Sequence, residues 1–228
     1  MSDMRIAILL PGFPRNYAVA KESLRVPYME KHQCDFFIHS WHYPDKFPPQ
    51  KYTEALSLFN PAKVLIEKQI VFDTSTERDQ WGLLVQNTMS QFFSVYRANE
   101  LKRMHERENN FKYDLVVRMR TDLRIVRPIP AEEVKQNVIG MYQWTQLGFG
   151  HMGLSDVFAI GSSELMDVYA SFYSQIPKYL ADDPTYNIPD GKTRPEYLLR
   201  HHLLTANNVP LQIFWHGDQT DPSFYLER

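Results

Sequence analysis

Apolar runs of strand length alternate along this chain with segments of helical periodicity. The strand-like runs occupy residues 6–10, 35–39, 62–67, 113–123, 138–142, 155–162 and 211–215. The helical patterns occupy residues 19–29, 52–59, 81–104, 131–135, 164–174 and 196–206. Several of the runs are apolar on both faces, which is typical of buried parallel strands that helices cover. The alternation therefore predicts an α/β fold with a mostly parallel central sheet flanked by helices.

Length and composition favour a single domain. The 228 residues suit one large domain or two small ones, and hydrophobic residues make up 43% of them. We find no internal repeat, low-complexity tract or linker, so we expect one domain over residues 1–228. The formal charge of -2 gives no overall electrostatic reason to expect nucleic acid as a partner.

Cysteine usage and hydropathy bear on the compartment. Cys34 is the one cysteine, so no disulfide can form within the chain. The apolar run at residues 6–10 is too short for a signal peptide. No stretch approaches the roughly 18–20 apolar residues of a membrane-spanning helix. We therefore expect a soluble, cytoplasmic protein without a transmembrane segment.

The run at residues 113–123 ends in charged side chains. Strand geometry would point Arg118, Arg120 and Asp122 to one face. Charges at the end of a buried strand are costly unless they pair with one another or bind a ligand. In open α/β sheets, ligands sit beyond the carboxyl ends of strands. Two interpretations stay open: part of a ligand site, or an edge strand with an ordinary arginine–aspartate salt bridge.

The ends of the first two runs carry further candidates. Residues 11–16 form a turn with one glycine, Gly12, and two prolines. Arg15 stands in this turn beyond the sheet, where a guanidinium group can bind a diphosphate through two hydrogen bonds. An arginine that caps a surface loop is the alternative. The second run leads directly into Trp41, which is placed at the same edge of the predicted sheet.

Two further segments have the composition of a ligand-binding region. On the long helical pattern, Gln91, Arg97 and Asn99 either reach a cleft or face solvent. Residues 143–153 combine tryptophan, phenylalanine and three glycines, which suits a loop that lines a substrate site. Both segments extend the candidate site beyond the strand ends.

These motifs occur in an order that resembles a known enzyme family. The order is an apolar strand with the turn at residues 12–15, then residues 35–41, 113–122 and 155–161. The set resembles the small nucleotide-sugar-dependent glycosyltransferases of the GT-A fold from capsule and lipopolysaccharide gene clusters. It is also similar to the glycosyltransferase domains of large DNA viruses that infect algae. The resemblance runs from Ile6 to about His216 and implies a GT-A-like, Rossmann-like domain.

The resemblance implies a division of the chain and a set of donor contacts. The donor-binding half is expected at about residues 1–125 and the acceptor side at about residues 126–228. The donor is a nucleoside-diphosphate sugar, first a UDP-sugar, and the acceptor is a glycan or another hydroxyl compound. The positions that match the donor contacts are Gly12, Arg15, Trp41, Arg118, Arg120 and Asp122.

The resemblance also implies a divalent cation, Mn²⁺ or Mg²⁺, between the donor diphosphate and an Asp-x-Asp motif. Here residues 120–122 read Arg-Thr-Asp, so Asp122 is the remaining carboxylate of the motif. One carboxylate together with phosphates and water is an acceptable Mg²⁺ site. His216 matches a terminal histidine of the metal or phosphate shell, and a surface residue after the last strand is the alternative.

Two carboxylates are candidates for the general base that an inverting transfer needs. Asp156, at the start of the run at residues 155–162, is the first choice. Its alternative role is that of a strand-start residue bonded to a loop backbone. Glu196 is the second choice, although its place at a helix start is also explained by the helix dipole.

The leading prediction is therefore a metal-assisted glycosyltransferase, with two alternatives. A sugar-nucleotide pyrophosphorylase is built on a similar sheet, but the turn at residues 11–16 lacks a glycine-rich, lysine-bearing loop for a triphosphate. A non-catalytic carbohydrate- or nucleotide-binding module is the other alternative. It stays open because Arg120 replaces the first aspartate of the motif.

Overall fold

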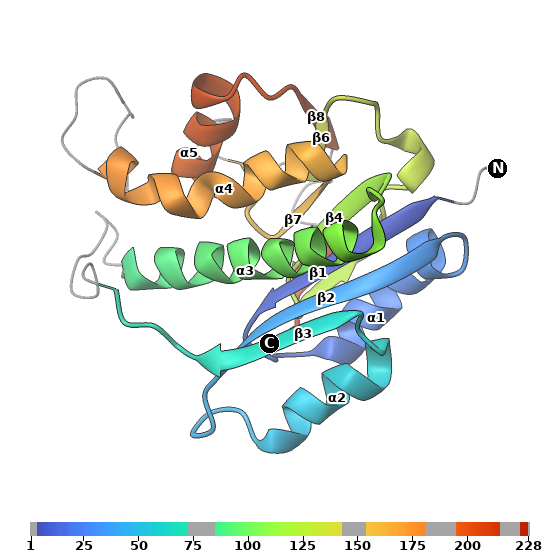
Figure 1. Cartoon of the computed structure of the whole chain (residues 1–228), viewed down its shortest axis with the longest axis vertical. Helices are drawn as coiled ribbons and strands as arrows, with labels where there is room; N and C mark the ends of the chain where they lie inside the picture. Colours follow the sequence, from blue (N-terminus) through green and yellow to red (C-terminus); the bar gives the residue numbers. More distant parts are fainter. Residues whose placement is uncertain (1–3, 73–84, 143–153, 181–194, 215–223, 228) are drawn as a thin grey trace.

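The centre of the structure is a seven-stranded sheet (Figure 1). The computed structural model describes residues 4–72, 85–142, 154–180, 195–214 and 224–227. The strand order is β3-β2-β1-β4-β7-β6-β8. The strands are β1 (Arg5–Gly12), β2 (Gln33–His42), β3 (Lys63–Lys68), β4 (Leu115–Met119), β6 (Ile139–Tyr142), β7 (Phe158–Gly161) and β8 (Leu211–Phe214).

Most neighbouring strands are parallel. β1 runs parallel to both β2 and β4, β2 to β3, and β6 to β8. β7 is antiparallel to both of its neighbours, β4 and β6. The sheet is therefore mixed but mostly parallel.

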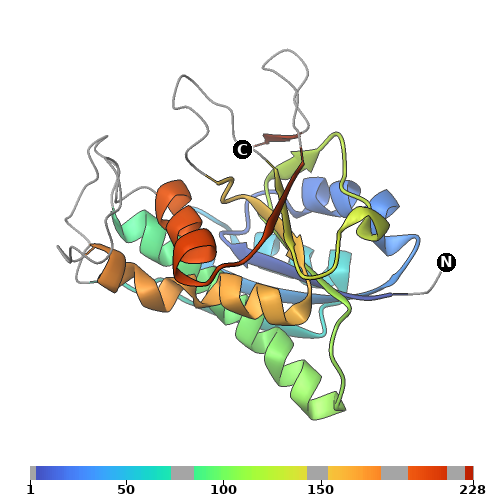
Figure 2. The ribbon, with the colours of Figure 1, turned by 90° about the horizontal axis from the view of Figure 1, so that it is seen from above.

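Helices cover both faces of the sheet (Figures 1 and 2). The helices are α1 (Tyr17–Leu24), α2 (Pro49–Phe59), α3 (Val85–Asn109), α4 (Ser163–Leu180) and α5 (Pro195–Arg200). In β1, Ala7 and Leu9 pack in the core beneath α3 and α4, whereas Ile6 and Ile8 pack in the core beneath α1 and α2. This two-sided burial explains the continuous apolar run, and the predicted α/β fold is confirmed. No helix within the described residues is both long and apolar enough to cross a membrane.

The strand predicted at residues 113–123 is shorter than expected. β4 ends before Arg120, and the chain then turns. β5 (Leu123–Ile125) leaves the main sheet and pairs antiparallel with β9 (Phe224–Leu226). Arg120 and Asp122 therefore lie in a turn and do not alternate on one strand face. The partner of β5 comes from about a hundred residues further along the chain, so no local pattern marks this break.

Helix ends also differ from their expected limits. The pattern at residues 164–174 predicts a helix followed by a proline-containing loop from Ile176, but α4 continues through Pro177 to Leu180. Ile176 and Tyr179 are buried in the core, so the packing of this last turn outweighs the hydrogen bond that proline cannot donate. Among the described residues, the short helical turns are η1 (Arg25–Met29), η2 (Ala131–Glu133) and η5 (His201–Ala206).

Candidate ligand-binding site

A pocket of about 760 Å³ lies at the carboxyl ends of β1, β2 and β4. From β1 the chain proceeds to β2 and β3 on one side, whereas β4 flanks β1 on the other side. Such a reversal is a topological switch point, where open α/β sheets bind their ligands. The pocket lining includes the sequence-predicted residues Gly12, Arg15, Trp41, Arg118, Arg120, Asp156 and Glu196.

Arg120 and Asp122 form a two-pronged ion pair at the edge of the pocket. Nε of Arg120 donates to Oδ1 of Asp122 at 2.9 Å, and Nη2 donates to Oδ2 at 2.9 Å. Nε of Arg15 lies 3.6 Å from the same Oδ2. The carboxylate has no exposed surface, whereas the Arg120 and Arg15 side chains are 15% and 37% exposed. Burial acts to raise the pKa of Asp122, but the hydrogen bond and charge of Arg120, with the charge of Arg15, outweigh it and lower the pKa.

Hydrogen bonds fasten the turn that carries Asp122 to two other parts of the chain. The Thr121 hydroxyl donates to the carbonyl of Phe13 at 2.9 Å, and the main-chain N–H of Arg15 donates to that hydroxyl at 3.4 Å. The main-chain N–H of Glu227 donates to the Asp122 carbonyl at 2.8 Å. The backbone of the turn that carries the ion pair is therefore hydrogen-bonded both to residues 13–15 and to Glu227.

Asp156 lies beside the arginines, in the segment that precedes β7. The main-chain N–H of Arg120 donates to the Val157 carbonyl at 3.1 Å, which brings this segment to the end of β4. Gln91 of α3 donates to Oδ2 of Asp156 at 2.7 Å. Arg118 is 1% exposed, and its Nη1 donates to the main-chain carbonyl of Asp156. Within the described residues, Nε of Arg118 has no hydrogen-bond partner.

Only one of the three polar residues predicted to reach a cleft from the long helix lines this pocket. That residue is Gln91. Nε of Arg97 lies 3.4 Å from Oε1 of Glu67, and Asn99 donates to Asp167 at 2.7 Å. Both of these side chains therefore serve contacts outside the pocket.

Aromatic rings form a second wall of the pocket. Phe13 and Phe47 stack with ring centroids 5.5 Å apart and planes 23° apart. The Arg15 guanidinium lies 5.7 Å from the centroid of Phe13, and Nζ of Lys46 lies 5.8 Å from that of Phe47. Sequence reasoning missed both phenylalanines. The aromatic residue between Gly12 and Arg15 in the sequence is the feature from which Phe13 could have been predicted to line the site.

The surroundings of Asp122 do not suit the role of metal ligand that the resemblance implies for this residue. Its two carboxylate oxygens both accept hydrogen bonds from Arg120, and the group is fully buried. Among the described residues, no group of three histidine, cysteine or carboxylate side chains is arranged to hold a metal ion. His216 and the loop at residues 143–153 lie outside the described residues, so their roles stay predictions.

Comparison with known proteins adds no family assignment. No protein-family model and no curated protein matches this chain. The case for a function therefore depends on the pocket and its side chains.

Proposed function

We propose that this protein is a glycosyltransferase that moves a sugar from a nucleoside-diphosphate sugar, first a UDP-sugar, to a hydroxyl group of a glycan or another acceptor. The observation that supports this most is the pocket at the β1/β4 switch point, in which arginines and aromatic rings lie side by side. Guanidinium groups match the geometry of phosphate oxygens. Aromatic faces stack on nucleobases of any kind. The two features together suit a nucleoside diphosphate.

The reaction assigns a role to each side of the pocket. The acceptor oxygen bonds to the anomeric carbon as the bond from that carbon to the diphosphate oxygen breaks. The nucleoside diphosphate leaves with the electron pair, and Arg15 and Arg120 offset its negative charge. In an inverting reaction, Asp156 takes the proton of the acceptor hydroxyl. Its hydrogen bond from Gln91 orients the carboxylate.

The test is a panel of nucleotide sugars incubated with the full chain, with release of nucleoside diphosphate as the readout. We expect one donor to be hydrolysed or transferred. Asp156→Asn lowers this rate by about 10²-fold or more while nucleotide binding is kept, because a positioned general base contributes roughly that factor. Glu196→Gln, at the second candidate base in the same pocket, should leave the rate unchanged, and a loss there in place of one at Asp156 would assign the base to Glu196.

Other outcomes would identify the alternatives. Release of pyrophosphate from a nucleoside triphosphate and a sugar phosphate would indicate a pyrophosphorylase. Nucleotide binding without turnover of any donor would indicate a non-catalytic binding module. Failure to bind any nucleotide or nucleotide sugar would refute the proposal.

A further inference from the structure

We infer that Asp122 positions Arg15 and Arg120 to bind the phosphates of the ligand directly, and that this pocket binds phosphate without a divalent cation. The inference rests on the proposed function, because it concerns the diphosphate end of the same pocket. It also departs from what the Asp-x-Asp resemblance implies, since that motif places a metal ion between protein and phosphate.

The first reason is that the Asp122 carboxylate has no exposed surface and is already paired with two arginines. The two parallel hydrogen bonds from Arg120, each 2.9 Å long, occupy one side of both oxygens. Arg15 adds a second positive charge 3.6 Å from Oδ2. A divalent cation binds through oxygen ligands and would have to displace a guanidinium group to reach this carboxylate. It would also stand next to two cationic side chains.

The second reason is that the arginines themselves are presented to the pocket. A guanidinium group has five N–H donors in a fixed plane. Asp122 accepts from Nε and Nη2 of Arg120, and no described residue accepts from its Nη1. Both Arg120 and Arg15 line the pocket. Arg120 thus keeps a charged N–H donor that suits an anionic ligand.

The third reason is that the two arginines are held in place before a ligand arrives. The side chain of Arg120 is locked to a buried partner, and the backbone of Arg15 is bonded to Thr121 in the same turn. Fixed cations of this kind stabilise charge that develops on a leaving group without reorganisation during the reaction. Asp122 therefore orients the two arginines and does not itself contact the ligand.

The direct test is calorimetric titration of the full chain with inorganic pyrophosphate and with UDP. One series contains excess EDTA, and parallel series contain saturating Mg²⁺ or Mn²⁺. We expect the affinities in EDTA to be at least as high as those with metal, since the cationic side chains carry the phosphate contacts and a cation bound to the free ligand occupies the same phosphate oxygens. An affinity in EDTA at least tenfold weaker than with metal would overturn the inference.

Arginine variants test whether pyrophosphate binds at this pocket or is attracted by positive charge anywhere on the protein. Arg120→Met and Arg15→Met should each weaken pyrophosphate binding in EDTA by roughly tenfold or more, the loss of one charge-assisted hydrogen bond. Arg25→Met is the matched control, because Arg25 is half-exposed, pairs with Glu30 and does not line the pocket. Equal affinities for all three variants and the unsubstituted chain would contradict the inference.

A double-mutant cycle tests the positioning role of Asp122. We expect Asp122→Asn to weaken metal-free pyrophosphate binding, and the loss in Arg120→Met/Asp122→Asn to be smaller than the sum of the losses in the two single variants. This coupling follows only if Asp122 acts through Arg120. Asp122→Asn that leaves metal-free binding unchanged, or strengthens it, would overturn the positioning role. If Asp122→Asn does not fold, the EDTA titration and the two arginine variants still decide whether the arginines bind phosphate without a divalent cation.

The two proposals fail in different ways. If pyrophosphate and UDP bind only with a divalent cation, the inference is wrong and the proposed glycosyltransferase stands. If no nucleotide binds under any condition, the proposed function fails as well.

Discussion

At the scale of single residues, His39 stands out because both of its ring nitrogens are bonded inside the fold. Nδ1 lies 2.6 Å from the Ser94 hydroxyl and Nε2 lies 2.9 Å from Oε1 of Glu67. The ring has no exposed surface. Burial lowers the pKa of His39 from 6.5 to about 4, although Glu67 acts in the opposite direction. The neutral ring is therefore the form that the fold accommodates.

This histidine makes stability depend on pH. Between about pH 6.5 and 4 the unfolded chain protonates His39 and the folded chain does not, so stability falls as the pH falls through this window. The slope from one such group is at most about 1.4 kcal/mol per pH unit. His39→Gln should flatten the pH dependence of the free energy of unfolding, measured by urea denaturation between pH 7.5 and 4.5.

A neighbouring position provides the control for this prediction. His42→Gln is the matched control, because residue 42 is an exposed histidine of the same strand. A smaller slope should remain in His39→Gln, since burial also lowers the pKa of His202. Identical pH profiles for His39→Gln and the unsubstituted chain would contradict the prediction.

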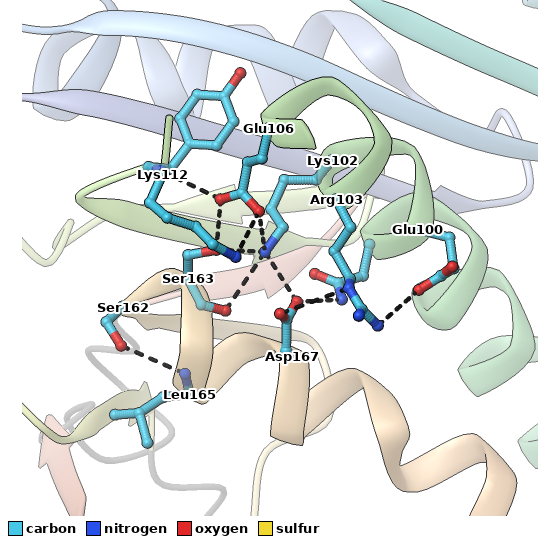
Figure 3. A network of polar contacts seen from close by, with 11 residues as sticks. Glu100, Lys102, Arg103, Glu106, Lys112, Ser162, Ser163, Leu165 and Asp167 are labelled. Atoms are coloured by element: carbon cyan, nitrogen blue, oxygen red, sulfur yellow. Dashed lines mark hydrogen bonds and ion pairs between the residues drawn. The ribbon is translucent and has the colours of Figure 1, made fainter. Parts of the chain in front are cut away.

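At the scale of elements, a buried lysine joins α3 to α4 (Figure 3). Lys102 of α3 has no exposed surface, and its Nζ donates to Oγ of Ser163 at 2.5 Å and to Oδ1 of Asp167 at 2.9 Å. Nζ also lies 3.5 Å from Oε2 of Glu106, one turn along the same helix. A paired charge in this position is tolerated because every partner is polar or ionised.

Removal of this lysine should loosen the packing of α3 against α4. We expect Lys102→Met to lower the free energy of unfolding by about 2–3 kcal/mol, because Asp167 and Ser163 lose a charge-assisted hydrogen bond. Among the described residues, the buried charge of Glu106 then keeps only Lys112, at 3.2 Å, as a cationic partner. Urea denaturation measures the change. Adding Glu106→Gln to this variant should recover part of the loss, since the substitution removes that charge.

The adjacent residue gives the matched control. Arg103 is 44% exposed and forms weaker ion pairs, with Glu100 at 3.1 Å and with the partly exposed Asp167 at 3.7 Å. Arg103→Met should therefore change the free energy of unfolding by less than about 1 kcal/mol, the usual value of an exposed ion pair. If Lys102→Met and Arg103→Met destabilise equally, the buried network is not what joins the two helices.

At the scale of the whole molecule, the last described strand supports the turn beside the candidate site. β9 pairs with β5, directly after the turn that carries Asp122. Glu227 bonds the Asp122 carbonyl and forms an ion pair with Arg124. Phe224 of β9 is buried and packs on Tyr142, with ring centroids 5.2 Å apart. A segment far along the chain thus supports the turn at the β1/β4 switch point.

This arrangement predicts that Phe224→Ala affects both stability and ligand binding. We expect a loss of about 3 kcal/mol in the free energy of unfolding, typical of a buried aromatic residue replaced by alanine. We also expect weaker pyrophosphate binding at temperatures where the variant is folded, because the turn loses its support. Urea denaturation and calorimetric titration measure the two effects.

A buried phenylalanine elsewhere separates the two effects. Phe172 of α4 has no exposed surface, packs on Phe92 with centroids 4.5 Å apart and does not line the pocket. Phe172→Ala should cost a similar stability of about 3–5 kcal/mol and leave pyrophosphate affinity unchanged. A Phe224→Ala variant with full affinity would show that β9 does not brace the site.

The sequence by itself determined the fold class and much of the candidate site. Runs such as residues 6–10 are apolar on both faces, and that local pattern is enough to predict a buried strand with helices on either side. Polar residues at strand ends then pointed to one edge of the sheet. Arg15, Arg118, Arg120 and Asp156 do line one pocket there.

The tertiary structure alone decided what these residues contact. The pairing of β5 with β9 and the antiparallel direction of β7 depend on segments far apart in the sequence. The same holds for the stacking of Phe13 on Phe47 and for the approach of Arg15 to Asp122. Alternation and periodicity report only which face of an element is buried. They do not report which element covers that face, and the partners of Asp122 are set by such long-range contacts.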